Sequence, residues 1–551
     1  MRTFLPLATI AASAAAAASI SRRSDPTVDL GYVTHQGHSN SRGVDEFLGL
    51  RFAAPPLGDL RWRAPADPEP VAGVQNATVK QAVCVGQDKL VVAGVTEEDC
   101  LYVNSYTPSK ATANPDAKLP VWVYLQGGGY QTNSGGNYNG TEVIVQSGYD
   151  IVHVNVNYRV AQLGFLGGVA VVEGGGDYNV GLLDQWKALE WVQEHIEQFG
   201  GDPDQVVLHG PSAGAGAVSH IMTAYDGVDH GLFVGTIGDA FAWGVGAYPN
   251  DTDAHFAMFS SQMGCANATD QMACLRATDI NKIQTFDRNA APPAGVPTPN
   301  MAMWFSPLID GVFVTGPQQD SFSQGKFVKV PMITGDATNE GNTFAPNAST
   351  TEEVTALAQL EFVNLTDAQI DTIVAAYDHP RPLPQHAAYF SVVADILGEF
   401  GFICPVNKVS MGVAAHLSPD QVWNYRWNTT EQLEVDMGWE AWHTSDIIPF
   451  FGPGQASGPD GYEDLDIGYS FYPGGENAAI VPVLQHYLIS FIKNLDPNVE
   501  RYAGSPEWEN WGEGLGQRLR IQTNATAMEE VPQDQVDRCN MFWDLNDIMK
   551  Q

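Results

Sequence analysis

The sequence predicts an α/β fold in which helices cover both faces of a mostly parallel sheet. Two observations support this prediction: apolar, strand-like runs alternate with amphipathic helical patterns, and glycines end several of these segments abruptly. No linker rich in Pro and Ser and no repeated unit divides the chain. We therefore expect one large domain over residues 19–551.

The predicted sheet begins with two strands that surround a run of glycines. Residues 119–125 form an apolar run typical of a buried strand, and Gly127, Gly128 and Gly129 follow it closely. Residues 151–156 are rich in β-branched side chains and predict the next strand.

A helix and a further strand follow. Apolar residues recur at three- and four-residue steps from Leu182 to Ile196, which predicts one face of a helix, and the glycines at 200–201 end it. Residues 206–208 predict a strand that leads into Gly-Pro-Ser-Ala-Gly at 210–214. This alternation of strand and helix indicates parallel strands with helical crossovers.

Residues 210–214 fit the G-x-S-x-G pattern between a strand and a helix-like segment. A sharp turn at this place exposes the hydroxyl of Ser212, and the flanking glycines remove side chains that would clash in the turn. The alternative is a Gly/Ser-rich turn without chemistry, which the strand-to-helix context disfavours. We expect Ser212 to be a nucleophile.

A serine hydroxyl attacks a carbonyl efficiently where an imidazole takes its proton and a carboxylate orients that imidazole. In this arrangement the chain order is Ser, then Asp or Glu, then His. The oxyanion needs main-chain donors, for which we expect the amide of Ala213 and the glycine loop, with Gly128 and Gly129 as its donors.

The composition excludes several classes of function. The 551 residues include 64 Asp and Glu against 27 Lys and Arg, a formal charge of −37, which argues against binding to nucleic acid or anionic membranes. Hydrophobic residues make up 44%, enough for an extended core, which excludes a disordered or fibrous chain.

The N-terminal segment has the pattern of a secretory signal over residues 1–18: Arg2 precedes an apolar, Ala-rich run. The pair Arg22-Arg23 is either a second processing site or a polar start of the mature chain. No later run approaches about 18 uninterrupted apolar residues, so we expect a secreted protein without a membrane anchor.

Cysteines and sequons agree with export. The six cysteines form an even set, as an oxidising compartment allows. Eight N-x-Ser/Thr sequons predict a glycosylated surface, and they begin at Asn76, Asn139, Asn250, Asn267, Asn347, Asn364, Asn428 and Asn524.

Further segments extend the pattern over nearly the whole mature chain. They are Pro-Pro-Leu-Gly at 55–58, Arg-Trp at 61–62, Glu-Asp-Cys-Leu-Tyr-Val-Asn at 98–104, Asn-Tyr-Arg at 157–159, Gly-Phe-Leu at 164–166, Asn-Val-Gly-Leu-Leu-Asp-Gln at 179–185 and Phe-Gly-Gly-Asp-Pro at 199–203. Together with the Gly-Pro-Ser-Ala-Gly turn at 210–214, these segments resemble the type-B carboxylesterase/lipase family of the α/β-hydrolase fold, which includes fungal esterases and lipases and the cholinesterases. The resemblance implies a serine carboxylic-ester hydrolase acting on a small-molecule ester.

Two carboxylates are candidates for the triad acid. Asp336 and Glu340 both follow a strand-like segment at 330–335, and by residue type either could orient a histidine. The resemblance favours Glu340, because the family places its glutamate just before a glycine, here Gly341.

Five histidines lie downstream of Glu340, and the resemblance selects one as the base. His443 lies in a predicted loop that matches the family's base position. We interpret the others as ordinary surface or core residues: His379, His386, His416 and His486.

The resemblance also implies three disulfides, Cys84–Cys100, Cys265–Cys274 and Cys404–Cys539. No cluster of His, Cys and carboxylates has the spacing of metal ligands, so we expect hydrolysis without a metal or cofactor.

The sequence departs from the family pattern beside the reacting centre, where Pro211 stands in place of a common Glu and Gln126 in place of a common His. The segment 85–99 is short and lacks tryptophan. In cholinesterases this loop carries the Trp that binds choline, and in many lipases of the family it forms a longer flap. We therefore expect simple esters with short or medium acyl groups. The alternatives are a lipase, a dedicated esterase for a secondary metabolite, and a non-catalytic cholinesterase-like binding protein.

Overall fold

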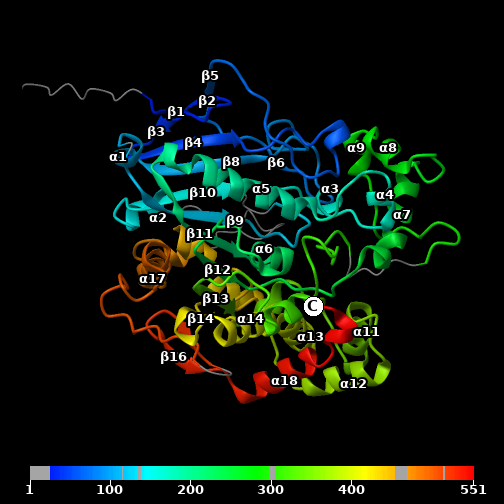
Figure 1. Cartoon of the computed structure of the whole chain (residues 1–551). Coiled ribbons are helices and arrows are strands. Elements are labelled where there is room, and N and C mark those ends of the chain that lie inside the picture. Colours follow the sequence, from blue (N-terminus) through cyan, green and yellow to red (C-terminus); the bar gives the residue numbers. More distant parts are fainter. Residues whose placement is uncertain (1–24, 115, 134–137, 298–303, 453–467, 513–515) are drawn as a thin grey trace, which may run out of the picture.

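The computed structural model describes residues 25–551 except 115, 134–137, 298–303, 453–467 and 513–515. The expected signal segment and Arg22-Arg23 therefore lie outside the described residues. The centre of the molecule is an eleven-stranded sheet with helices on both faces (Figure 1). The predicted α/β fold is confirmed.

Most of the central sheet is parallel. Strands β10, β9, β11, β12, β13, β14 and β15 pair in parallel in that order, and antiparallel strands complete both edges. From one edge to the other the strands are β16 (Ala527–Glu530), β15 (Gln517–Ile521), β14 (Val422–Trp427), β13 (Met332–Ala337), β12 (Gly235–Asp239), β11 (Gly201–Pro211), β9 (Leu119–Leu125), β10 (Val152–Val156), β8 (Tyr102–Pro108), β4 (Val44–Arg51) and β3 (His38–Ser39).

Smaller sheets and short helices surround this sheet. The small sheets are β1 (Thr27–Asp29), β2 (Thr34–Gln36) and β5 (Val74–Asn76), and β6 (Val83–Cys84) with β7 (Thr96–Glu97). The short α-helices are α1 (Ser109–Thr112), α3 (Ala161–Gly164), α4 (Val169–Glu173), α8 (Gln271–Arg276), α9 (Ile280–Ile283), α10 (Gln318–Ser323), α15 (Gln432–Met437) and α19 (Asn546–Met549). The 3₁₀ helices include η1 (Gly58–Leu60), η2 (Ile196–Phe199), η3 (Pro249–Thr252), η5 (Glu340–Thr343), η7 (Pro419–Gln421) and η9 (Tyr469–Phe471).

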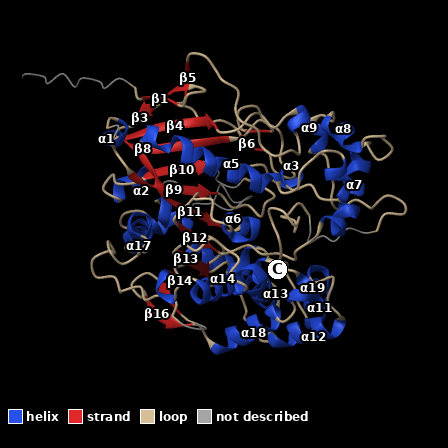
Figure 2. Ribbon diagram, in the orientation of Figure 1, coloured by secondary structure: helices blue, strands red, loops and turns tan. Residues whose placement is uncertain are grey.

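Strand β9 shows why helices cover both faces of the sheet. Val121, Val123 and Leu125 belong to one buried cluster, and the alternating Trp122 and Tyr124 belong to another, as the two-residue period of a strand requires. The first face carries α5 (Val180–His195), α6 (Ala213–Gly227) and α14 (Cys404–His416), and the second carries α2 (Thr141–Gln146), α16 (Ile447–Phe451) and α17 (Ile480–Asn494) (Figure 2).

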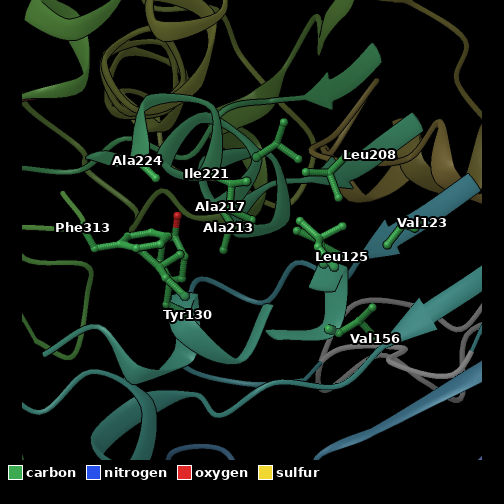
Figure 3. Close-up of a cluster of buried hydrophobic side chains, with 14 of the residues drawn as sticks. Val123, Leu125, Tyr130, Val156, Leu208, Ala213, Ala217, Ile221, Ala224 and Phe313 are labelled. Carbon is green, nitrogen blue, oxygen red and sulfur yellow. The ribbon is translucent and has the colours of Figure 1, made fainter. Parts of the chain in front are cut away.

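Helix α6 packs closely on the sheet because its first turns consist of small residues. Ala213 and Ala217 are fully buried and lie near Leu125 and Leu208 of the strands (Figure 3). Ile221 continues the same face one turn later. This close packing fixes the start of α6, which directly follows Ser212.

A long apolar helical segment forms part of the core. Phe390–His416 comprises α13 (Phe390–Gly398), a π-helical turn η6 (Glu399–Ile403) and α14, and 78% of its most apolar window is buried inside the fold. Its burial is that of a core helix. Around it lie α11 (Thr351–Glu361), α12 (Asp367–Ala376) and α18 (Gln533–Trp543), and α7 (Asp253–Met263) lies beside α4 and α8 (Figure 1).

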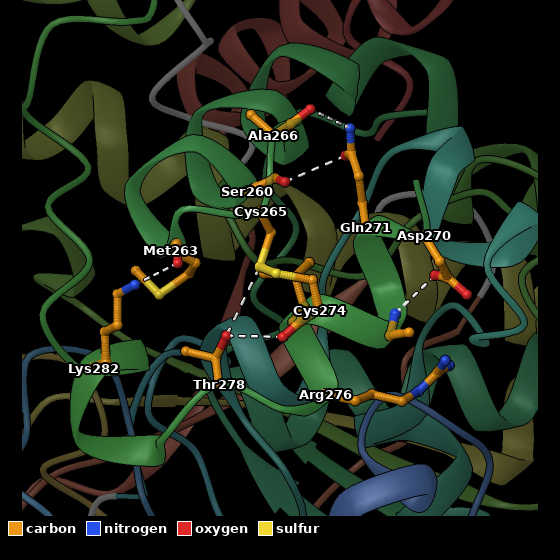
Figure 4. Close-up of a disulfide and its surroundings, with 12 residues drawn as sticks. Ser260, Met263, Cys265, Ala266, Asp270, Gln271, Cys274, Arg276, Thr278 and Lys282 are labelled. Carbon is orange, nitrogen blue, oxygen red and sulfur yellow. Dashed lines mark hydrogen bonds between the residues drawn. A yellow bond between two sulfur atoms is a disulfide. The ribbon is translucent and has the colours of Figure 1, made fainter. Parts of the chain in front are cut away.

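Three disulfides join the cysteine pairs that the resemblance implied: Cys84–Cys100, Cys265–Cys274 and Cys404–Cys539. The second closes a short loop between α7 and α8, where Thr278 donates a hydrogen bond to the carbonyl oxygen of Cys274 (Figure 4). The third ties α18 to the start of α14 across 135 residues of sequence.

Most sequons are accessible. Asn139 and Asn428 are partly buried, and the exposed ones are Asn76, Asn250, Asn267, Asn347, Asn364 and Asn524.

A buried ion pair joins the loop after β10 to α5. The Arg159 guanidinium donates to both carboxylate oxygens of Asp184 at 2.7 and 2.8 Å, and the Arg159 main-chain amide donates to the same group at 3.0 Å. Both side chains are almost fully buried. Removing one charge would leave the other without compensation.

We predict that Asp184→Asn lowers the free energy of unfolding by about 3–5 kcal/mol, because the guanidinium stays buried and loses its counter-charge. Urea denaturation measures this loss. The matched control is Glu197→Gln, which removes an exposed pair with Lys118 and should cost less than about 1 kcal/mol. Equal losses in the two variants would contradict the prediction.

Candidate active site

Ser212 lies in the turn between β11 and α6, with φ +57° and ψ −128°. This conformation is strained for a residue other than glycine and is typical of a serine in a strand-to-helix elbow. The flanking glycines are sterically required: a Cβ on Gly210 would lie 2.5 Å from Gly214, and one on Gly214 would lie 2.3 Å from the carbonyl oxygen of Leu125.

The glycine loop lies against this elbow because β9 and β11 are neighbouring parallel strands. A Cβ on Gly127 would lie 3.0 Å from Cβ of Ser212. Gly128 and Gly129 both have positive φ, and a Cβ on Gly128 would collide with the carbonyl oxygen of Thr132 at 2.1 Å. The structure thus places the glycine loop against Ser212 through Gly127, and Gly128 and Gly129 follow it directly in the chain.

Glu340 and His443 meet across two loops that follow β13 and β14. Nδ1 of His443 forms a short hydrogen bond with a carboxylate oxygen of Glu340, and the other oxygen accepts the amide of Ala337 at 2.5 Å. The Glu340 side chain is 1% exposed. Gly341 must be glycine, because a Cβ there would lie 1.8 Å from the carbonyl oxygen of Ala394.

Main-chain contacts hold these two loops together. The amide of Asn339 donates to the carbonyl oxygen of Ala441 at 2.9 Å, and the side chain of Asn342 donates to the carbonyl oxygens of Gly438 and Trp439 at 3.1 Å. His443 is therefore oriented by its loop as well as by Glu340.

Asp336, the alternative acid, lies elsewhere in this region. Its carboxyl has no hydrogen-bond partner among the described residues, and its nearest cation is Arg518 at 3.9 Å. Burial raises the pKa of the Asp336 carboxyl to about 7. The structure thus brings Glu340, and not Asp336, to His443.

Nε2 of His443 is buried and has no hydrogen-bond partner among the described residues, so the ring keeps one nitrogen available. The other candidate histidines bond elsewhere or line another cavity: His386 to Met437, His416 to Ser323, His486 to Gln146 and Glu500, while His379 lines a polar cavity.

Two phenylalanines flank the His443 ring. Phe344 lies 4.9 Å and Phe402 4.4 Å from it, measured between ring centroids. Phe402 comes from the π-helical turn η6, a type of helix defect that is common at functional sites. The Phe400–Phe402 stretch also lines a cavity beside the site.

This cavity has a volume of about 370 Å³ and begins at the glycine loop. Gly129, Ala242, Trp243, Phe344 and Phe402 are among its lining residues. Trp243 is buried and also lines this space. The volume and the largely apolar lining suit a small organic ligand.

A buried polar network lies behind the site. Trp122 donates to Nδ1 of His209 at 3.1 Å, and Nε2 of His209 bonds to Asp239 at 2.7 Å. The hydroxyl of Tyr425 contacts both Asp239 and Asp446. Sequence reasoning missed this network, although Asp446 stands only three residues after His443.

The two departures from the family pattern both lie at this centre. Pro211 is the last residue of β11, and Gln126 follows β9 with an amide that has no hydrogen-bond partner among the described residues. Across the described part of the chain, no group of three or more His, Cys, Asp and Glu is arranged to hold a metal ion.

Comparisons with known proteins agree with this geometry. Residues 26–540 match the sequence profile of the Carboxylesterase family. The chain is 29% identical to Lipase 2 of Geotrichum candidum, over 88% of this chain and 89% of that protein. It is 30% identical to a secreted triacylglycerol lipase of Gibberella zeae, over 86% and 83%.

A solved structure is also similar. The crystal structure of Aspergillus niger EstA superposes with a TM-score of 0.88 at 42% sequence identity, covering 96% of this chain and 99% of that one. The chain therefore belongs to the Carboxylesterase family and is a carboxylic ester hydrolase of the α/β-hydrolase fold.

Proposed function

We propose that the chain hydrolyses esters with short or medium acyl groups through a triad of Ser212, His443 and Glu340. The observation that carries this proposal is the bond between Nδ1 of His443 and Glu340, in a chain that also has a strained serine elbow with a glycine loop against it. This is the combination of base, orienting acid and main-chain donors that acyl transfer needs.

In the first step, Oγ of Ser212 attacks the ester carbonyl and its proton passes to Nε2 of His443. The carbonyl oxygen becomes an oxyanion, which the amides of Gly128, Gly129 and Ala213 stabilise. Ala213 is the first residue of α6, so its amide has no partner within the helix. When the carbon–oxygen bond of the leaving alcohol breaks, His443 returns the proton to that oxygen.

In the second step, water attacks the acyl-enzyme. His443 takes a proton from the water, the ester bond to Ser212 breaks, and the proton returns to Oγ as the acid leaves. Glu340 keeps the imidazole in one orientation and stabilises the imidazolium that forms in both steps.

The buried network behind the site has a defined protonation state. Trp122 is only a donor, so Nδ1 of His209 is an acceptor and Nε2 carries the proton that Asp239 accepts. Tyr425 has one hydroxyl proton but faces two carboxyl groups. A single hydroxyl proton can bond to only one of the two, so the other carboxyl carries a proton of its own and donates it to the Tyr425 oxygen. Because Asp239 already accepts from His209, we assign this carboxyl proton to Asp446.

A neutral Asp446 suits its place beside the triad. Burial, with the charge of Asp239 as a smaller cause, raises the pKa of the Asp446 carboxyl well above its usual range, and the nearby charge of Glu340 acts in the same direction. Asp446 directly precedes α16 and follows His443 by three residues, so the network ties the His443 loop to β12 and β14. We infer that Asp446 is a positioning residue.

We propose that residues 1–18 are a signal peptide and that the remaining chain is secreted as one domain. The three disulfides, the exposed sequons and relatives described as secreted lipases support this proposal.

A lipase is the second candidate, favoured by one surface feature. The loop between Cys84 and Cys100 exposes three aliphatic side chains, Leu90 (80%), Val92 (46%) and Val95 (58%). Exposed apolar residues beside a site favour contact with a lipid surface. The loop contacts the segment that follows the glycine loop, because the amide of Gln87 donates to the carbonyl oxygen of Gln131.

We predict that the protein hydrolyses p-nitrophenyl esters with an optimum at short or medium chains, and that Ser212→Ala lowers kcat by more than about 10³-fold. The measurement is the initial rate from acetate to palmitate, with circular dichroism to check the fold of the variant. A long-chain optimum would favour the lipase. A folded wild type without activity or fluorophosphonate labelling at Ser212 would contradict the proposal.

We predict that Glu340→Gln lowers kcat by about 10³- to 10⁴-fold, because the imidazole loses the charge that orients it. Asp336→Asn is the matched control. It replaces a buried acid that does not contact His443, so the loss should be far smaller. Steady-state kinetics decide between the two acids: a dominant loss in Asp336→Asn would overturn this assignment.

We predict that Asp446→Asn makes stability less dependent on pH. The raised pKa means that folded Asp446 holds a proton that the unfolded chain releases above about pH 4, so wild-type stability falls as pH rises from there toward the raised pKa. The slope reaches at most about 1.4 kcal/mol per pH unit. Urea denaturation across this range tests the assignment, and an unchanged slope in the variant would refute it.

A further inference from the structure

The cavity beside the reacting centre adjoins a second, apolar cavity. The two share Leu397 and Glu361 as lining residues. The second cavity has a volume of about 220 Å³ between α11 and α13. Apart from Glu361 its lining is apolar: Pro346, Val354, Leu357, Ala358, Leu360, Phe362, Val393, Ile396 and Leu397. Glu361 thus lies at the border between the two cavities.

Glu361 stands where the helix pattern calls for an apolar residue. Val354 and Ala358 are the buried residues of α11, and position 361 follows them by seven and three residues, on the same face. Glu361 is also the last residue of α11, where the helix dipole disfavours a negative charge. Neither core packing nor helix stability explains this carboxyl.

The Glu361 carboxyl also has no counter-charge among the described residues. It is partly buried, and burial raises its pKa. The cation that lines the first cavity, Lys550, is paired with Asp251 at 2.9 Å. His220 lines the same cavity, but burial lowers its pKa to about 3, so it is neutral.

We propose that Glu361 is a specificity residue that binds a protonated amine on the ester substrate, whose alkyl portion lies in the second cavity. The ammonium group supplies the counter-charge and hydrogen-bond donors that the carboxyl lacks, and the apolar lining takes the alkyl chain. The net charge of −37 also favours a cationic substrate, because it concentrates cations at the protein surface. The inference rests on the proposed function, because it assigns a substrate class to that site.

The test compares two inhibitors of p-nitrophenyl acetate hydrolysis: n-hexylammonium and the neutral hexanamide, which matches it in length. Wild type, Glu361→Gln and Glu352→Gln are measured. Glu352 is an exposed glutamate on the same helix that does not line either cavity, so its variant controls for the loss of one charge. The readout is the ratio of the two inhibition constants in each protein.

In wild type, n-hexylammonium should bind about tenfold or more tightly than hexanamide, the gain expected of a hydrogen bond to a charged group. The preference should vanish in Glu361→Gln and persist in Glu352→Gln. A preference that survives in Glu361→Gln and declines with salt would mean only general attraction by the surface charge and would overturn the proposal.

Equal binding of the two inhibitors by an active wild type would also overturn it, while leaving the proposed ester hydrolysis intact. A folded wild type without hydrolysis and without fluorophosphonate labelling at Ser212 would instead refute the proposed function, and this substrate site with it.

Discussion

The parallel pairing of β9 with β11 is the constraint on which the rest of the site depends. His209 pairs with Tyr124, so the two strands end side by side at the same edge of the sheet. The glycine loop and Ser212 follow directly, which leaves the Cβ of Ser212 only 3.0 Å from where a side chain on Gly127 would begin. The pairing of β13 with β14 acts in the same way on the loops that carry Glu340 and His443. The main-chain pairing of the strands therefore already places the segments that carry the site residues next to one another.

The parts of the fold and site that could be predicted from the sequence are those that local patterns encode. The apolar run at 119–125 coincides with β9, and the helix expected from Leu182 to Ile196 lies in α5 except for Ile196, which begins η2. The elbow motif is also local, because Gly210, Ser212 and Gly214 lie within five residues of chain, although the atom that Gly214 must avoid belongs to Leu125 of the neighbouring strand. The triad acid does not follow from residue type alone. Asp336 and Glu340 are four positions apart, and the choice depends on which side chain turns toward His443.

The features that the sequence did not predict depend on side chains from distant segments. The sequence pattern does not distinguish Tyr425 from the apolar residues of a buried strand, yet its hydroxyl contacts both Asp239 of β12 and Asp446 of the His443 loop. Phe402 reaches the His443 ring because a π-helical turn interrupts a helix that the apolar pattern describes as continuous. Periodicity reports which face of an element is buried, but it does not report which groups meet there.

Asp336 and Asp446 are both buried near the charge of Glu340, and these three acids cannot all carry a charge. Hydrogen-bond donors decide which of them does. Glu340 accepts the amide of Ala337 and faces Nδ1 of His443, so its negative charge is stabilised on both oxygens. Asp336 accepts no hydrogen bond from the described residues, and burial raises its pKa to about 7. The same residue chemistry thus has different outcomes at two neighbouring positions, because the end of β13 and the His443 loop direct donors to Glu340 and not to Asp336.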